Sequence, residues 1–211
     1  MFVRNHMTRA PVTIVPETPI FDALQIMKRN KIRQLPVALP DGTLVGLVTE
    51  RDLLMVSPSP ATTLSIYEVN YLLAKMTVRE VMIKSPAMIK PEATLEEAAV
   101  IMREHKFGSL LVINEGKLVG IITESDLFDA FIKIFGFRRP GTRLVVVADN
   151  RMGTLADLLA IIRDHKMNVI GLAALEMPEQ RAQIMVRIGA TQLGSLLEEL
   201  QAKGFEVQAV N

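Results

Sequence analysis

The sequence of 211 residues repeats itself, and this repeat limits the possible folds more than any other feature. Met7 aligns with Met82, at a shift of 75 residues, and many neighbouring positions match in the same register. The shift falls to 74 residues at the turn where Gly42 aligns with Gly116. A one-residue gap in a turn is what duplication of a folding unit produces. The repeat therefore predicts two similar structural units in tandem.

Each copy is predicted to fold as strand, helix, strand, strand and helix. In the first copy, Thr18 is expected to cap a helix whose first turn contains Pro19. In the second copy, Thr94 and Glu97 have the spacing of a capping box. The remaining expectations are helix faces of Ile20, Leu24 and Met27 and of Leu95, Ala99 and Met102, strands at 35–38, 44–48, 110–113 and 118–122, and closing helices opened by Thr49 and Thr123.

A third unit follows a linker at 137–141. Its patterns predict strands at 144–148, 169–175, 184–188 and 205–210, with helix faces of Leu155, Leu158, Leu159 and Ile162 and of Leu193, Leu196, Leu197 and Leu200. The order β-α-β-β-α-β is that of a ferredoxin-like fold. The chain is thus predicted to be an α/β (α+β) protein with a first repeat at 1–56, a connecting segment with an inserted helix at 57–75, a second repeat at 76–136 and a third domain at 142–211.

The two repeats resemble CBS domains, and the tandem pair resembles a Bateman module. The resemblance rests on Leu-Val-Thr-Glu-Arg-Asp at 47–52 and Ile-Ile-Thr-Glu-Ser-Asp at 121–126, with further matches at 7–13 and 32–37. The third unit resembles an ACT domain through the segments near Asn150 and Asn168, although Met152 stands where that family usually has proline. The order of the units is similar to that of the acetoin-utilisation accessory proteins.

CBS pairs commonly bind adenosine-containing ligands in clefts between their repeats. The resemblance therefore implies a regulatory protein that binds AMP, ADP, ATP or an S-adenosylmethionine-like ligand. It also implies a role near acetoin or acetyl-CoA metabolism, and a regulated protein that the sequence does not identify. The residues that it implies for nucleotide binding are Thr13, Arg33, Pro36, Thr49, Arg51, Asp52, Ser109, Thr123, Ser125 and Asp126.

Thr49 and Asp52 have two interpretations. Threonine and aspartate at this spacing can cap the helix that follows, where negative charge also suits the helix dipole. The carboxylate can also accept hydrogen bonds from ribose hydroxyls, beside a helix N-terminus that offers free N–H groups to phosphate. Thr123 and Asp126 repeat the pattern, and both interpretations stay open for the two pairs.

Arg33 and Arg51 make the two copies unequal, because their counterparts in the second copy are Gly108 and Ser125. Arginines are usually solvated surface charges. In a nucleotide cleft they would instead donate charge-assisted hydrogen bonds to phosphate. We therefore expect one tighter nucleotide site in each chain, which depends on Asp52 and on at least one of the two arginines. The alternative is that the arginines of one repeat serve a cleft in which the other repeat holds the ribose.

ACT domains commonly bind amino acids at interfaces between subunits. The resemblance implies that Asn150 and Asn168 hold an amino acid and that Gly153 allows close approach of the backbone. Asparagine in such turns also serves local backbone hydrogen bonds, which is the alternative. Both kinds of domain commonly dimerise, so we expect a two-fold homodimer, with an interface that includes some of Phe128, Phe131, Ile132 and Phe135.

Composition argues against several other functions. The 24 basic and 23 acidic residues give a net charge of +1, without the excess of basic residues that nucleic-acid binding requires. Cysteine is absent and the three histidines lie far apart, so no metal site is expected. The sequence has no catalytic constellation, so we expect neither an enzyme nor a catalytic cofactor. It has no signal peptide or membrane-spanning run either, which predicts a cytoplasmic protein. The alternative function is a structural or dimerisation protein without a small-molecule ligand.

Overall fold

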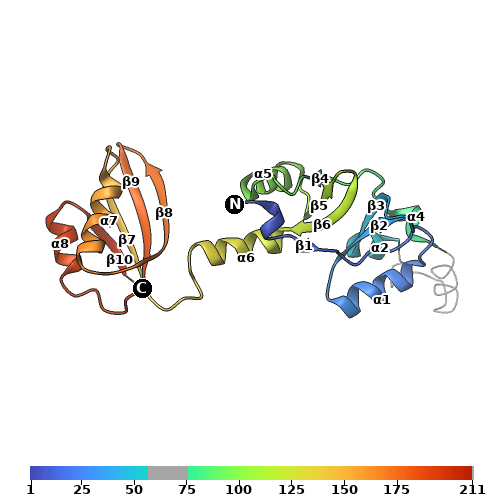
Figure 1. The fold of residues 1–211 in the computed structure, drawn as a ribbon, viewed down its shortest axis with the longest axis horizontal. Helices are drawn as coiled ribbons and strands as arrows, with labels where there is room; N and C mark the ends of the chain where they lie inside the picture. Colours follow the sequence, from blue (N-terminus) through green and yellow to red (C-terminus); the bar gives the residue numbers. More distant parts are fainter. Residues whose placement is uncertain (57–75, 211) are drawn as a thin grey trace. The chain divides into compact units, whose positions relative to one another are not determined.

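A computed structural model describes residues 1–56 and 76–210 of the chain, which form two units, Met1–Leu127 and Phe128–Asn211 (Figure 1). The helix expected within 57–75 lies outside the described residues. No helix in the described ranges is long and apolar enough to cross a membrane. In the same ranges, no group of three acidic, histidine or cysteine side chains is arranged to hold a metal ion.

The two repeats of the first unit follow the predicted order of elements. The first contains a 3-10 turn, η1 (Val3–Asn5), then β1 (Thr8–Arg9), α1 (Ile20–Asn30), β2 (Gln34–Ala38), β3 (Leu44–Thr49) and α2 (Glu50–Met55). The second contains α4 (Val78–Val81), β4 (Met88–Ile89), α5 (Leu95–His105), β5 (Ser109–Asn114), β6 (Lys117–Thr123) and α6 (Glu124–Ile134). The mixed α+β fold with two similar repeats is therefore confirmed.

The start of α1 differs from the prediction. Pro19, not Thr18, is the N-cap residue, and its extended backbone keeps the chain out of the helix until Ile20. The capping box of α5 is confirmed, since Thr94 N–H donates to Glu97 Oε2 at 2.7 Å and Glu97 N–H donates to Thr94 Oγ1 at 3.1 Å. The buried face of each helix differs from the prediction at its middle position. Ala23 is buried in place of Leu24, and Ala98 in place of Ala99, so that the buried residues follow the spacing i, i+3, i+7.

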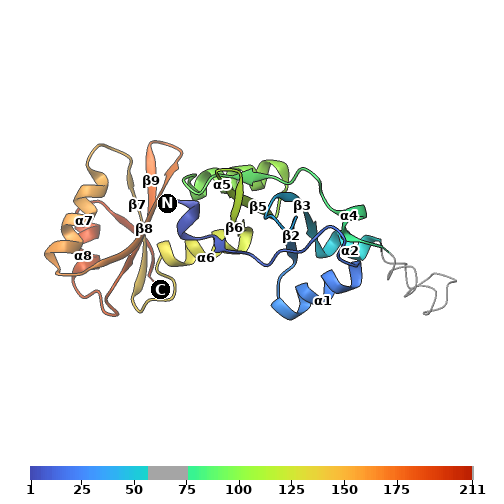
Figure 2. The same cartoon turned by 45° about the vertical axis from the view of Figure 1, so that its right-hand side comes forward.

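Each repeat begins with a segment that pairs with the other repeat. β1 of the first repeat pairs antiparallel with β6 of the second, with Thr8 opposite Ile121. Ile83 of the second repeat forms the corresponding bridge to Leu47 of the first. The sequence pattern predicted a first strand in each copy. It did not predict that the first segment of each repeat pairs with the hairpin of the other repeat, an exchange of segments that interlocks the two repeats. β1 and β6 are labelled side by side in Figure 1, and Figure 2 shows the blue N-terminal segment running beside β6.

A glycine in each repeat allows this exchange. A Cβ at Gly120 would lie 2.6 Å from Met7 Sδ and 2.9 Å from the Thr8 carbonyl oxygen. The equivalent position, Gly46, would meet Met82 Sδ and the backbone oxygen of Ile83, each at 2.9 Å. These distances are too short for a carbon atom, so only glycine lets the exchanged segments lie this close to the hairpins.

The second unit contains β7 (Thr142–Asp149), α7 (Thr154–Asp164), β8 (Val169–Met177), β9 (Arg181–Ile188), α8 (Leu196–Ala202) and β10 (Glu206–Val210). Its antiparallel sheet has the order β10-β7-β9-β8, the ferredoxin-like arrangement. Both helices lie on one face of the sheet (Figure 1). The face of α7 differs from the prediction, since Leu158, Ile161 and Ile162 are buried whereas Leu155 is 38% exposed.

The segment that leads into this sheet is closely packed within the second unit. A Cβ at Gly171 would lie 2.7–2.9 Å from three backbone atoms of Phe135. Arg187 also donates two hydrogen bonds to the carbonyl oxygen of Arg139, from Nε at 3.2 Å and from an Nη atom at 2.8 Å. The predicted linker at 137–141 is therefore held against β9, and the residue Phe135 just before it lies against β8.

Candidate functional site

A cleft of about 750 Å³ combines residues of both repeats in the first unit. This volume is within the usual range for small-molecule sites. Arg33 and Arg51 come from the first repeat, at the start of β2 and in the first turn of α2. Thr123, Ser125 and Asp126 come from the second repeat, where β6 turns into α6. The other lining residues are Thr8, Ala10, Pro11, Val12, Lys31, Ile32, Gln34, Gly108, Ile121 and Glu124.

Asp126 acts as a helix cap and still has a free carboxylate oxygen. Thr123 N–H and Oγ1 donate to Asp126 Oδ2 at 2.8 and 2.7 Å, and Asp126 N–H donates to Thr123 Oγ1 at 3.3 Å. Among the described residues, Oδ1 has no hydrogen-bond partner. The structural role is therefore present, and it leaves one oxygen able to accept a hydrogen bond from a ligand in the cleft.

Thr49 and Asp52 have the same geometry in the first repeat. Thr49 N–H and Oγ1 donate to Asp52 Oδ2 at 3.0 and 2.7 Å, and Asp52 N–H donates to Thr49 Oγ1 at 3.2 Å. Neither residue lines the cleft that contains the two arginines. The cleft therefore combines the arginines of one repeat with the aspartate of the other, the arrangement that the sequence left open beside the grouping with Asp52.

The cleft is rich in unpaired positive charge. Lys31, Arg33 and Arg51 are exposed, and none of them forms an ion pair with another residue in the described part of the chain. Two acidic residues, Glu124 and Asp126, line the same cleft. The N-terminus of α6 adds the partial positive charge of a helix end. An anion in this cleft would meet more cationic than anionic groups.

Three other predicted site residues lie outside the cleft lining. Thr13 lines a separate hollow of about 390 Å³ beside Ile14 and Val15. Pro36 is buried in β2, opposite Leu47 of β3. Ser109 is only 5% exposed, and its hydroxyl donates a hydrogen bond to Gln34 Oε1.

Gln34, Lys31 and the segment at 10–12 line the cleft but were not predicted as site residues. The segment reaches the cleft because β1 pairs with β6. A sequence pattern that shows only the presence of a strand could not reveal this pairing. Ala10 in this segment has a left-handed φ of 44°, which is unusual for a residue with a Cβ.

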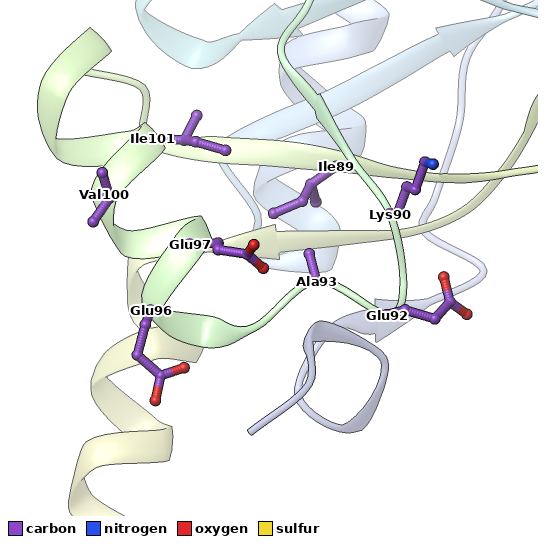
Figure 3. Close-up of a pocket in the computed structure, with 8 residues that line it drawn as sticks. All are labelled: Ile89, Lys90, Glu92, Ala93, Glu96, Glu97, Val100 and Ile101. Carbon is purple, nitrogen blue, oxygen red and sulfur yellow. The ribbon is translucent and has the colours of Figure 1, made fainter.

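A second hollow, of about 710 Å³, lies on α5 and the loop before it (Figure 3). Ile89, Val100 and Ile101 give it apolar walls, and acidic side chains surround them. These acids have local partners, since Glu97 belongs to the capping box and Glu96 lies 3.7 Å from the N-terminal ammonium. The pKa of Glu96 is lowered, chiefly by a hydrogen bond from its own backbone N–H, with the ammonium charge adding to the effect.

The candidate residues of the second unit do not meet within one chain. Asn150 precedes α7 and donates to Glu176 Oε1 at 3.4 Å, whereas Asn168 follows α7 and its carbonyl oxygen accepts a hydrogen bond from Gly189 at 2.8 Å. α7 has 11 residues, so its two ends are about 16 Å apart. Gly153 is the N-cap residue of α7, with a φ of 91°.

Two interlocked repeats that share a polar, cationic cleft define a paired-repeat module. The chain belongs to the CBS domain family, which it matches over residues 3–59 and 78–133. A CBS domain-containing protein of Dictyostelium discoideum is 33% identical over 135 residues, which cover 64% of this chain and 93% of that protein.

Two solved structures show the same pair of repeats. One is described as an acetoin utilization protein (AcuB) from Vibrio cholerae, with 32% identity, a TM-score of 0.55 and coverage of 65% of this chain and 95% of the other. The other is CBSX2 of Arabidopsis thaliana in complex with AMP, with 32% identity, a TM-score of 0.53 and coverage of 63% and 97%.

Proposed function

We propose that the CBS pair binds an adenine nucleotide in the cleft between its repeats and thereby acts as a regulatory, non-catalytic module. The observation that carries this proposal is the convergence of Arg33 and Arg51 with Thr123 and Asp126 in one cleft. In the proposed complex, Asp126 Oδ1 accepts hydrogen bonds from the ribose hydroxyls. The arginines and the N-terminus of α6 bind the phosphate. The AMP complex of the similar CBSX2 supports the choice of ligand.

Within the class of adenosyl ligands, the charge of the cleft favours nucleotides. S-Adenosylmethionine has a net positive charge, because its sulfonium and ammonium groups outweigh its single carboxylate, and this charge would face Lys31, Arg33 and Arg51. A phosphate would instead neutralise them, and hydrogen bonds to charged groups contribute about 1.5–3 kcal/mol each. We therefore propose AMP, ADP or ATP as the ligand, in preference to a sulfonium compound.

A thermal-shift panel followed by calorimetric titration tests this proposal. The panel contains adenosine, AMP, ADP, ATP and S-adenosylmethionine, and the protein is first freed of co-purified ligand by unfolding and refolding. We expect stabilisation by at least one nucleotide, and a reduced effect in the Arg33→Gln and Arg51→Gln variants. An absence of response to all five compounds would instead favour a structural or dimerisation protein without a small-molecule ligand.

For the second unit, we propose an ACT-type role in which two copies of the chain share an amino acid. Asn150 and Asn168 lie at opposite ends of α7, so one ligand can contact both side chains only if they come from different copies. Gly153, which has a left-handed φ at the N-cap of α7, would allow the ligand to approach the backbone closely. An amino acid that raises the melting temperature of the wild type but not of Asn168→Ala would support this role. No response to any common amino acid would reject it.

A role in acetoin or acetyl-CoA metabolism is a further proposal, supported by the description of the Vibrio cholerae neighbour. The non-catalytic role is supported by the Dictyostelium relative, a CBS domain protein that the match covers over 93% of its length. Loss of growth on acetoin in a strain that lacks the gene would support the metabolic link. Turnover of the bound nucleotide by the purified protein would contradict the non-catalytic role.

A further inference from the structure

Gln34 is held in one orientation by the other repeat. Its side chain lines the cleft and is half-buried. The hydroxyl of Ser109 donates a hydrogen bond to Gln34 Oε1, and Ser109 is itself almost fully buried. The two residues occupy equivalent positions in the repeats, because the two copies align at a shift of 75 residues in this region. Because the amide oxygen is bound to Ser109, the opposite side of the amide, Nε2, faces away from it.

The Nε2 group lies beside the start of α6. A Cβ on Gly108 would be 3.3 Å from Gln34 Nε2, so the amide nitrogen is next to the backbone of Gly108. The carbonyl oxygen of Gly108 in turn accepts a hydrogen bond from the N–H of Glu124, the first residue of α6, at 3.2 Å. No acceptor for Nε2 is present among the described residues. The cleft therefore contains an oriented, unused donor close to a helix N-terminus, which is where anions bind.

We propose that Gln34 Nε2 donates a hydrogen bond to the phosphate of the bound nucleotide, and that Ser109 is the positioning residue that directs it there. This inference rests on the proposed function, and it assigns a residue to the recognition of phosphate rather than of the nucleoside. Arg33, the neighbour of Gln34, lines the same cleft, so the donor lies next to positive charge. Ser109 thus contributes through Gln34, without contact with the ligand.

The Gln34→Glu variant tests the inference with little change in shape. The new carboxylate still accepts the hydrogen bond from Ser109, but it presents a negative oxygen where the wild type has an N–H donor. Gln25→Glu is the matched control, because Gln25 is exposed on α1 and does not line the cleft. AMP and adenosine are titrated into each protein by calorimetry.

We expect Gln34→Glu to weaken AMP binding about tenfold or more, since it replaces a hydrogen-bond donor to a charged group by a carboxylate that repels the phosphate. Adenosine binding should change less than about threefold, and Gln25→Glu should match the wild type for both ligands. Ser109→Ala should also weaken AMP more than adenosine, which a general loss of packing would not do.

Unchanged AMP affinity in Gln34→Glu, or an equal loss for AMP and adenosine, would overturn the phosphate contact. Unchanged AMP affinity in Ser109→Ala would overturn the positioning role of that residue. A wild-type protein that binds none of the nucleotides would instead contradict the proposed function itself, so the two failures are distinguishable.

Discussion

Replacement of Gly120 by alanine tests whether the exchanged segments hold the two repeats together. The added Cβ would lie 2.9 Å from the carbonyl oxygen of Thr8, whereas ordinary contacts begin near 3.4 Å. The carbonyl oxygen of Thr8 must therefore move about 0.5 Å away from the new Cβ. Met7 Sδ, at 2.6 Å, can rotate away, but the Thr8 oxygen belongs to the backbone of β1 and is fixed by its pairing with β6.

We expect Gly120→Ala to lower the free energy of unfolding by about 1–3 kcal/mol, the usual cost of overpacking. For a unit of this size, that cost corresponds to a fall in melting temperature of about 3–10 °C. Gly46→Ala should behave alike, because its Cβ would meet the backbone oxygen of Ile83 at 2.9 Å. Urea unfolding followed by circular dichroism measures both effects.

Gly108→Ala is the control for Gly120→Ala. The nearest atom to its added Cβ is Gln34 Nε2, at 3.3 Å, which is only slightly closer than the 3.4 Å of an ordinary contact, so the unfolding free energy should change by less than about 1 kcal/mol. A Gly120→Ala protein as stable as the wild type would refute the reasoning. An equal loss in Gly108→Ala would show that the effect does not come from the exchanged segment.

Three further predictions concern the rest of the molecule. Gly171→Ala should lower the melting temperature of the second unit, because its Cβ would press on the backbone of Phe135. Gly189→Ala is the control, because its Cβ would have no contact under 3.5 Å, and equal melting temperatures of the two variants would contradict the prediction. The hydrogen bond from Arg79 lowers the pKa of Glu17 below its ordinary value of 4.5. The stability that Glu17→Gln removes should therefore be present at pH 7 and be lost as the pH falls below 4.5. Thermal unfolding of the wild type and the variant at pH 7 and below pH 4.5 measures this loss, and a difference that does not depend on pH would contradict it. The chain should be a homodimer by light scattering at micromolar concentration, because large aromatic side chains of α6 are exposed; a monomer would contradict this.

The sequence predicted most of the elements because the signals for them are local. The capping pattern of Thr94 with Glu97, and the pairs Thr49 with Asp52 and Thr123 with Asp126, predicted helix starts that the structure contains. The ferredoxin-like order of the second unit also followed from alternating strand and helix patterns. Such signals depend on residues within a few positions of one another, and a single sequence displays them directly.

The composition of the cleft could not be predicted in this way, because it depends on pairing between the repeats. The sequence left open whether Arg33 and Arg51 share a cleft with Asp52, their neighbour in the chain, or with the aspartate of the other repeat, and the cleft brings them to Asp126. Gln34 was missed because its significance comes from the hydrogen bond with Ser109, 75 residues away in the sequence. Duplication also makes the two aspartates look equivalent, although only Asp126 lines the cleft with both arginines.

The most direct test of the account is a calorimetric titration of AMP into the wild type, Asp126→Ala and Asp52→Ala. Both variants lose the same capping interaction, so they control for each other's effect on stability. We expect Asp126→Ala to weaken the tight site about tenfold or more, and Asp52→Ala to retain it. A tight site that is lost in Asp52→Ala and retained in Asp126→Ala would contradict the account.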